Sequence, residues 1–427
     1  MKRLLVVIVI VLVALFGAIV YLGLAEDKGS VAPAAATNST DQIERGSYLV
    51  RAGDCLACHT TRGGVPFAGG RPIQTPFGTI YSSNITPDNA TGIGSWSGDD
   101  FWRALHNGKA RDGTLLYPAF PYPNYTMVTR TDADAMYAYF KTLAPVNQAN
   151  KEPDLSFPFN HRSLLVAWRA LYFRAGEYKP EPNRNAEWNR GAYLVQGLGH
   201  CNACHTARNI LGATETRNDL GGAVIPVSDW YAPSLTSITE VGLGEWELQH
   251  IIDLLRTGVS ARAVASGPMA EVVRQSLQHL TEGDIRAMST YLKSLPEAPE
   301  AENDYAVVAS KPENQFALKL GASIYEKYCV ECHKASGKGE PPGFPPLAGN
   351  REVMLKIFVN PVRAVLHGGY PPSTDGNPRP YGMPPFGAIL NDVEVAAVVS
   401  YIRNTWGNAS SMVYPAQVTQ LRSVPLD

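Results

Sequence analysis

The chain carries Cys55-Leu56-Ala57-Cys58-His59 near its start, and the same spacing returns at Cys201-Asn202-Ala203-Cys204-His205 and Cys329-Val330-Glu331-Cys332-His333. The sequence contains 6 cysteines, and these three C-x-x-C-H motifs use all of them. Such a run is the attachment signature of c-type haem. Two thiols on one helical turn bond the two vinyl groups of a porphyrin, and the histidine that follows faces the iron. The sequence therefore predicts three covalently bound haem c groups.

The predicted haem-binding thiols are Cys55, Cys58, Cys201, Cys204, Cys329 and Cys332. The predicted proximal iron ligands are His59, His205 and His333. A structural zinc site would need four ligands close together, whereas these motifs lie far apart along the chain. A redox dithiol should sit on a βαβ pattern, and none surrounds any motif. Disulfides would need cysteines outside the motifs.

Length and charge limit the number of domains and the kinds of binding partner. The 427 residues allow about three domains, at roughly 100–200 residues each. The formal net charge is −2, so the composition gives no support for a polyanionic partner such as nucleic acid.

The N-terminal segment, residues 1–28, contains a long apolar run. Lys2 and Arg3 precede an uncharged stretch from Leu4 to Ala25, which reaches the roughly 20 residues that a membrane-spanning helix needs. The basic residues would stay in the cytoplasm and place the chain after Glu26 outside it. A cleaved signal peptide ending at Ala25 is the alternative, but the run exceeds a usual signal core of about 7–15 residues. We therefore favour an uncleaved anchor, with the rest of the chain outside the cytoplasm.

Three units repeat the same internal order. Each opens with a predicted helix that carries a glycine ahead of the motif, at Gly46, Gly191 and Gly321. Each closes with a helix that begins on a capping residue with an acid three positions later: Thr129, Thr281 and Asn391 are these caps. A tyrosine follows every cap by ten residues, at Tyr139, Tyr291 and Tyr401, and we interpret these tyrosines as core. The agreement indicates an internal repeat.

This order resembles the cytochrome c fold, in which the first and last helices cross over the haem edge. The resemblance implies a mainly α chain with three tandem cytochrome c-type domains at 41–150, 186–298 and 314–408. The glycines would let the crossing helices approach closely.

The stretches between the units differ in composition. Gly29 to about Thr40 is expected to be a flexible tether, and Pro296–Gln315 an exposed linker. Ser163–Phe173 predicts a helix, and for its Trp168, and for His161 before it, a quinone or haem-edge role stands as the alternative to plain packing. The tail after Trp406 shows no clear amphipathic period.

The second iron ligand must be argued for each unit. Met383, in a proline-rich loop, lies eight residues before its helix cap, and Met269, in a Gly-Pro loop, lies twelve before its own. We favour both as distal ligands, since a Met ligand raises haem potential. In the first unit the similar position is Phe120, which cannot bind iron. His106, Met127 and an open site are the three alternatives there.

As a whole the chain resembles the three-haem cytochrome c subunits of bacterial membrane-bound dehydrogenases that oxidise alcohols, gluconate, fructose or aldehydes. The resemblance spans about Gln42 to Trp406, and the matching pieces are Arg45–Thr60, Asn84–Pro87, Leu116–Tyr122, Arg190–Thr206 and the Met383 loop. It implies a catalytic dehydrogenase subunit as partner and ubiquinone or another respiratory carrier as acceptor. Family members commonly have methionine where this chain has Phe120.

The residues themselves support the same function less specifically. No G-x-G-x-x-G fingerprint, further metal cluster or nucleophile with a base is evident, so we expect no catalytic residues in this chain. The leading hypothesis is a triheme electron-transfer subunit on the periplasmic side of the inner membrane. A haem peroxidase that uses an open first haem, and a cytochrome subunit of a terminal oxidase, are the alternatives.

Overall fold

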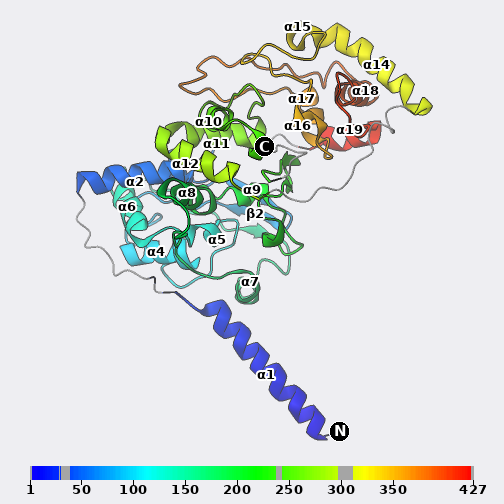
Figure 1. Ribbon diagram of the computed structural model, residues 1–427. Helices are drawn as coiled ribbons and strands as arrows, with labels where there is room; N and C mark the ends of the chain where they lie inside the picture. The colour runs from blue at the N-terminus through cyan, green and yellow to red at the C-terminus, as the bar shows by residue number, and fades with distance from the viewer. Residues whose placement is uncertain (1, 28, 30–38, 237–242, 297–310, 425–427) are drawn as a thin grey trace. The chain divides into compact units, whose positions relative to one another are not determined.

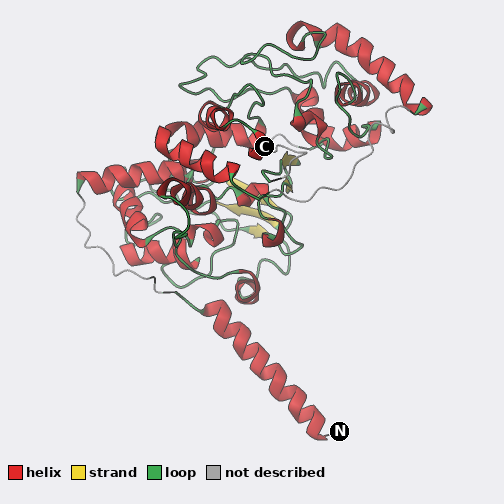
Figure 2. Cartoon of the chain, viewed as in Figure 1, coloured by secondary structure: helices red, strands yellow, loops and turns green. Residues whose placement is uncertain are grey.

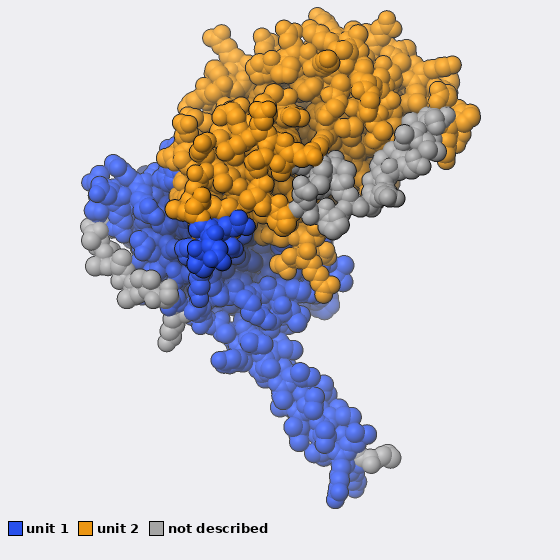
Figure 3. Space-filling model, in the orientation of Figure 1, with its two compact units in different colours: residues 1–184, 192–200, 208–214 blue, residues 185–191, 201–207, 215–427 orange. Residues whose placement is uncertain are grey.

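The computed structural model describes residues 2–27, 29, 39–236, 243–296 and 311–424, and the others are grey in Figure 1. The described chain is mainly helical, which confirms the predicted class (Figure 2). It separates into two compact units: residues 1–184, 192–200 and 208–214 form unit 1, and residues 185–191, 201–207 and 215–427 form unit 2 (Figure 3). Most of the predicted tether and linker lies outside the described residues.

Unit 1 contains the first motif and its surrounding helices. Its elements are α1 (Lys2–Leu24), α2 (Thr40–Ala52), α3 (Cys55–Cys58), β1 (Pro72–Thr75), β2 (Gly78–Tyr81), α4 (Gly98–Asn107), α5 (Tyr122–Tyr125), α6 (Arg130–Phe140), β3 (Asp154–Leu155), α7 (Leu164–Tyr172) and the π-helix η1 (Tyr193–Leu198). The predicted helices at Thr129 and within 163–173 are confirmed as α6 and α7.

The helix α1 is long and apolar enough to cross a membrane. Its side chains are exposed except at its C-terminal end, where it packs against α7. A Cβ atom on Gly23 would lie 2.0 Å from the Val166 carbonyl oxygen, so only glycine permits this approach.

Short antiparallel strands, which the sequence did not lead us to expect, complete unit 1. The sheet has the order β1-β2-β3, with Ile73 opposite Ile80 and Thr79 opposite Asp154. It connects the loop after the first motif with the segment that leads into α7.

Unit 2 contains the second and third motifs. Its helices are α8 (Ala186–Ala192, whose last residue belongs to unit 1), α9 (Asn202–His205), α10 (Leu248–Thr257), α11 (Gly267–Gln275), α12 (Glu282–Lys293), α14 (Pro312–Tyr328), α15 (Val330–His333), α16 (Arg351–Met354), α17 (Val359–His367), α18 (Asp392–Arg403) and α19 (Pro415–Arg422). Three 3-10 turns, η2 (Thr216–Asn218), η3 (Leu243–Glu245) and η4 (Leu277–His279), and the paired strands β4 (Ala223–Ile225) and β5 (Trp230–Ala232) complete it.

The three predicted closing helices begin where the capping pattern places them. The Thr129 and Thr281 hydroxyls accept from the N–H groups of Asp132 and Asp284 at the starts of α6 and α12. Asn391 and Glu394 form a full capping box at the start of α18. These caps satisfy N–H groups that a helix start leaves without intrahelical partners.

The three opening glycines lie at equivalent helix crossings. A Cβ atom on Gly46, Gly191 or Gly321 would come within 1.9, 2.0 or 2.2 Å of a carbonyl oxygen in the closing helix. The nearest side-chain atom at each crossing is the Cβ of the repeated tyrosine: Tyr139, Tyr291 or Tyr401. The prediction that glycine permits this close approach is confirmed.

The segment after Trp406 differs from its expectation. It folds back as α19, and Val418 and Leu421 join the buried cluster around α17 and α18. Arg422 fastens α19 through a 2.8 Å ion pair with Asp392 and a 3.0 Å hydrogen bond to the Leu390 carbonyl. No amphipathic period is visible here because only two apolar side chains of this short helix face inward.

Candidate haem sites

Each C-x-x-C-H motif lies on or beside a single short helix. Cys55 and Cys58 begin and end α3, α9 ends on His205, and α15 ends on His333. In each motif the histidine N–H bonds the carbonyl of the first cysteine, at 2.9, 3.0 and 2.9 Å. One helical turn therefore carries both thiols and the histidine, as attachment to one macrocycle requires.

The three motif histidines are held in the same way. The Nδ1 atoms of His59 and His205 lie 2.7 Å from the backbone oxygens of Ser83 and Pro233, and His333 Nδ1 lies 3.1 Å from the Pro345 oxygen. A carbonyl oxygen can only accept, so Nδ1 carries the proton in each ring. The Nε2 lone pair is left for a metal, which is the arrangement that orients histidine ligands in metal sites.

Burial sets the charge of these groups. It lowers the pKa of His59, His205 and His333, so the neutral imidazole that can bind iron is favoured. Burial also raises the pKa of the Cys201 thiol to about 12 and that of Cys329 to about 11. Two thiols and a neutral histidine on each turn form a donor set that fits a covalently attached haem.

Met383 lies in a loop that is fastened to the end of α17. Its N–H and C=O bond Gly369 at 2.7 and 3.0 Å, and the Cβ that Gly368 lacks would lie 2.3 Å from the Met383 oxygen. Met383 and Cys329 both border the same apolar cluster. The structure therefore places the predicted thioether and the third motif around one core.

Met269 lies in the first turn of α11, whereas the sequence suggested a loop. The helix begins at Gly267, whose φ of +53° and contact with the Trp230 ring require glycine. Trp230 belongs to the same short segment as Pro233, whose carbonyl holds the His205 ring. One segment thus supports both the predicted proximal ligand and the start of the helix that carries Met269.

The first motif has an aromatic neighbourhood. Tyr125 donates its hydroxyl proton to the Gly53 carbonyl, 2.9 Å away, and burial raises its pKa well above the ordinary value. Phe120 packs against Tyr125, with ring centroids 5.3 Å apart. Phe120 therefore packs on the tyrosine that bonds Gly53, two residues before the first motif.

Both ring nitrogens of His106 already have hydrogen-bond partners, so the ring is not available to bind iron. It is fully buried, its Nδ1 lies 2.8 Å from the Thr126 carbonyl oxygen, and its Nε2 lies 3.1 Å from an Asp27 carboxylate oxygen. Its ring also stacks on Trp102 at 4.2 Å. Both nitrogens are engaged, so His106 is withdrawn from the three alternatives, which leaves Met127 and an open site.

Met127 is half-buried. Its carbonyl accepts from the Tyr178 N–H at 3.0 Å, and its Cβ lies 3.4 Å from the position of a Cβ on Gly197. It therefore packs toward the π-helix that leads to the second motif.

Comparisons with known proteins agree with this chemistry. The family model of cytochrome c matches residues 318–406. The gluconate 2-dehydrogenase cytochrome c subunit of Pantoea cypripedii is 40% identical over 96% of this chain and 94% of its own length. The quinone-dependent alcohol dehydrogenase cytochrome c subunit of Gluconacetobacter polyoxogenes is 39% identical over 89% of this chain and 84% of its own. The fructose dehydrogenase cytochrome subunit of Gluconobacter japonicus is 37% identical over 92% and 85%.

The chain belongs to the family of dehydrogenase cytochrome c subunits. Covalent haem c follows from this membership. The family assignment also confirms the resemblance on which the sequence interpretation drew.

No sequence pattern marked one residue of this cytochrome c subunit, His200. It directly precedes Cys201, is half-buried, and hydrogen-bonds the Gly53 carbonyl. Its ring meets Tyr125 edge-on at 5.6 Å. His200, directly before the second motif, is therefore hydrogen-bonded to Gly53, two positions before the first motif. Its positive φ of 38° fixes this turn, which an isolated histidine in a sequence does not reveal.

Proposed function

We propose that this cytochrome c subunit carries three haem c groups and passes electrons from a catalytic dehydrogenase subunit to ubiquinone or another respiratory acceptor. The observation that carries the proposal is the identical arrangement of His59, His205 and His333, each with Nδ1 on a backbone carbonyl and Nε2 left for iron. Haem supplies reversible one-electron chemistry when bound. The chain's own residues attach it, orient its iron ligand and exclude water around it.

The distal ligands belong to the same proposal. Met269 and Met383 would bind the second and third irons, and a thioether would raise both potentials. With Phe120 in the first unit, the first haem would have a lower potential unless Met127 reaches it. A difference of this kind would set the direction of electron flow along the chain.

The partner is proposed from the relatives. Their names describe cytochrome subunits of gluconate, alcohol and fructose dehydrogenases. We infer that substrate oxidation occurs on a separate catalytic subunit and that this chain receives its electrons.

We also infer that α1 is retained as an anchor in the inner membrane, with both units in the periplasm. Arg169 is 1% exposed, and its guanidinium donates to the Gly23 oxygen at 2.8 Å and the Asn107 oxygen at 2.5 Å. The buried Lys109 ammonium bonds the Leu24 oxygen at 2.6 Å. Cleavage after Ala25 would remove the Gly23 and Leu24 oxygens. Arg169 would keep only the Asn107 oxygen and Lys109 only the Glu26 carboxylate, 2.7 Å away. Losing hydrogen-bond acceptors of buried cations is costly.

Purification of the full chain in mild detergent tests the proposal. We expect a covalent haem content of three per chain, co-purification with a larger dehydrogenase subunit, and reduction of a ubiquinone analogue when the donor is supplied. A haem content of one or two would overturn the triheme assignment. Co-purification with oxidase subunits would instead identify a terminal-oxidase cytochrome.

A second candidate function rests on the first predicted haem domain, residues 41–150, alone. Phe120 cannot bind iron, and both His106 nitrogens are engaged. An open first iron could bind peroxide. Electron paramagnetic resonance of the oxidised protein at neutral pH distinguishes the cases: a high-spin ferric signal with peroxide turnover supports the peroxidase, and three low-spin signals exclude it.

A further inference from the structure

Helix α7 points apolar side chains outward and its charged side chain inward, which is the reverse of a surface helix in a water-soluble protein. Its exposed positions follow a spacing of three and four residues and are apolar: Leu164, Ala167 and Leu171, with half-buried Trp168 between them and exposed Tyr172 at the end. Leu171 is 62% exposed and Leu164 is 47% exposed. The one charged residue of α7, Arg169, points inward. An apolar outward stripe of this kind is typical of helices that lie on a membrane.

Arg169 explains why the helix is oriented this way. Its guanidinium reaches three backbone oxygens, those of Gly23, Ala25 and Asn107, and lies over the Phe173 ring at 4.6 Å. These contacts fix the rotation of α7, so Leu164 and Leu171 must face outward. The exposure of the stripe is therefore imposed by a buried, hydrogen-bonded charge.

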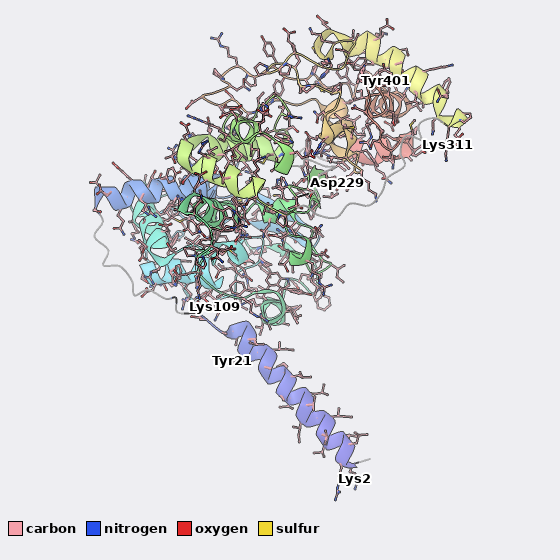
Figure 4. The ribbon with its side chains drawn as sticks, in the orientation of Figure 1. Lys2, Tyr21, Lys109, Asp229, Lys311 and Tyr401 are labelled. Atoms are coloured by element: carbon pink, nitrogen blue, oxygen red, sulfur yellow. The ribbon has the colours of Figure 1, made fainter. Side chains whose placement is uncertain are left out.

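The position of α7 relates it to the proposed anchor. The carbonyl of Val166 touches Gly23, in the last turn of α1. Figure 4 shows Tyr21 and Lys109 near this end of α1, and Lys109 bonds the Leu24 oxygen. If α1 crosses a bilayer, as the proposed function requires, α7 lies at the level where α1 leaves it.

A neighbouring turn extends the apolar surface. The indole N–H of Trp168 donates to the Leu211 carbonyl at 3.0 Å, so the turn at Ile210 and Leu211 lies beside α7. Ile210 is 91% exposed and Leu211 is 41% exposed. This bond also shows that Trp168 has a packing partner. Tryptophan and tyrosine at the edge of such a surface match the headgroup level of a bilayer.

We propose that the surface formed by Leu164, Ala167, Trp168, Leu171, Tyr172 and the Ile210–Leu211 turn, the α7 face, binds the lipid surface beside α1. The occupant is lipid because the face continues from a membrane-spanning helix, and because α7 contains no acidic residue. Two attachments, one through the bilayer and one on its surface, would hold unit 1 in a fixed orientation above the membrane.

Photocrosslinking in the full-length, haem-loaded protein tests this inference. The photoreactive amino acid p-benzoylphenylalanine replaces Leu171, Tyr21 or Asp99 in turn, and each variant is placed in bilayers of phosphatidylethanolamine and phosphatidylglycerol. Asp99, whose side chain is 71% exposed on α4, is the control for general exposure. We expect lipid adducts at 171 and 21 and none at 99.

The outcomes separate this inference from the function on which it rests. Adducts at 21 without adducts at 171 would overturn the α7 face and leave the anchor intact. The absence of adducts at both positions would overturn the anchor itself.

A second variant tests the chemistry of the face. Leu164→Glu, combined with the photoprobe at 171, should lose most of the lipid adduct at 171 while the haem content and the adduct at 21 are unchanged. An undiminished adduct at 171 would show that the apolar character of the face does not bind lipid.

Discussion

Arg190 binds Asp284 through two hydrogen bonds, with Nε 2.8 Å and Nη2 2.6 Å from separate carboxylate oxygens. The pair joins the opening helix α8 to the first turn of α12. Arg45 and Asp132 also join α2 to α6, but Nε at 2.8 Å and Nη2 at 2.5 Å both bond one carboxylate oxygen. In the third sequence repeat, Leu320 takes the position that arginine has in the other two repeats. Two of the three helix crossings therefore carry this ion pair.

Asp284→Ala should lower the free energy of unfolding by ~1–2 kcal/mol, because the paired arginine is only 30% exposed and loses a two-bonded partner. The Thr281 cap is expected to remain, since Thr281 accepts from a backbone N–H. Thermal unfolding of the holoprotein measures the change. Glu340→Ala, which removes the exposed partner of Lys334, is the control and should change little. Equal effects of the two substitutions would contradict the prediction.

Gly46→Ala, Gly191→Ala and Gly321→Ala should each destabilise their own helix crossing by about 1–3 kcal/mol, because the added methyl group would overlap a backbone oxygen. Gly283→Ala is the matched control: it lies in α12, and its nearest neighbour, the Thr281 hydroxyl, is 3.9 Å from the added atom. Gly283→Ala should leave the free energy of unfolding unchanged or raise it, since alanine favours the helix. Urea titration followed by circular dichroism checks both, and a stable Gly191→Ala protein would refute the close-contact argument.

Met383→Leu and Met269→Leu should each lower the midpoint potential of one haem by on the order of 0.1 V, because axial ligands tune haem potentials over about 0.8 V. Covalent haem content should not change, since the cysteines remain. Potentiometric titration measures the shift. Met412→Leu, at a buried methionine just after the third predicted domain, is the control and should leave every potential in place. If neither ligand variant moves a midpoint, the distal assignments are wrong.

Arg169→Met should cost roughly 2–4 kcal/mol, because three backbone oxygens around the end of α1 lose their donor in a buried site. The chain between Glu26 and Gly29 should also become more sensitive to protease. Limited proteolysis with mass spectrometry detects this. Arg256→Met, on an exposed position of α10, controls for the loss of charge and should leave the cleavage pattern unchanged.

Burial lowers the pKa of His200, which gives a pH dependence of defined sign. The unfolded state binds a proton near pH 6.5 and the folded state only at lower pH, so stability falls as the pH drops below about 6.5. His200→Asn removes this contribution, and asparagine tolerates the positive φ. The variant should lose less stability than the wild type between pH 7 and 5. Parallel curves for the two proteins would show that His200 does not titrate with folding.

Local patterns in the sequence predicted much of this protein. The C-x-x-C-H spacing places two thiols and a histidine on one turn, and that chemistry does not depend on distant residues. The caps at Thr129, Thr281 and Asn391 and the glycines at the helix crossings follow from local hydrogen bonding and from the space that a missing side chain leaves. The strands, whose segments are short, and α19, with few inward-facing residues, gave no readable period.

Only the tertiary structure decided which side chains meet across the chain. His106 had the spacing of a possible ligand, but Asp27 and Thr126, which are distant in sequence, occupy both its nitrogens. The carbonyls of Ser83, Pro233 and Pro345 fix the motif histidines, and no sequence pattern marks a carbonyl as an acceptor. The sequence alone determined which groups this cytochrome c subunit can bind. The fold determined which of its polar groups are already satisfied, because hydrogen-bond partners depend on positions in space and not on spacing along the chain.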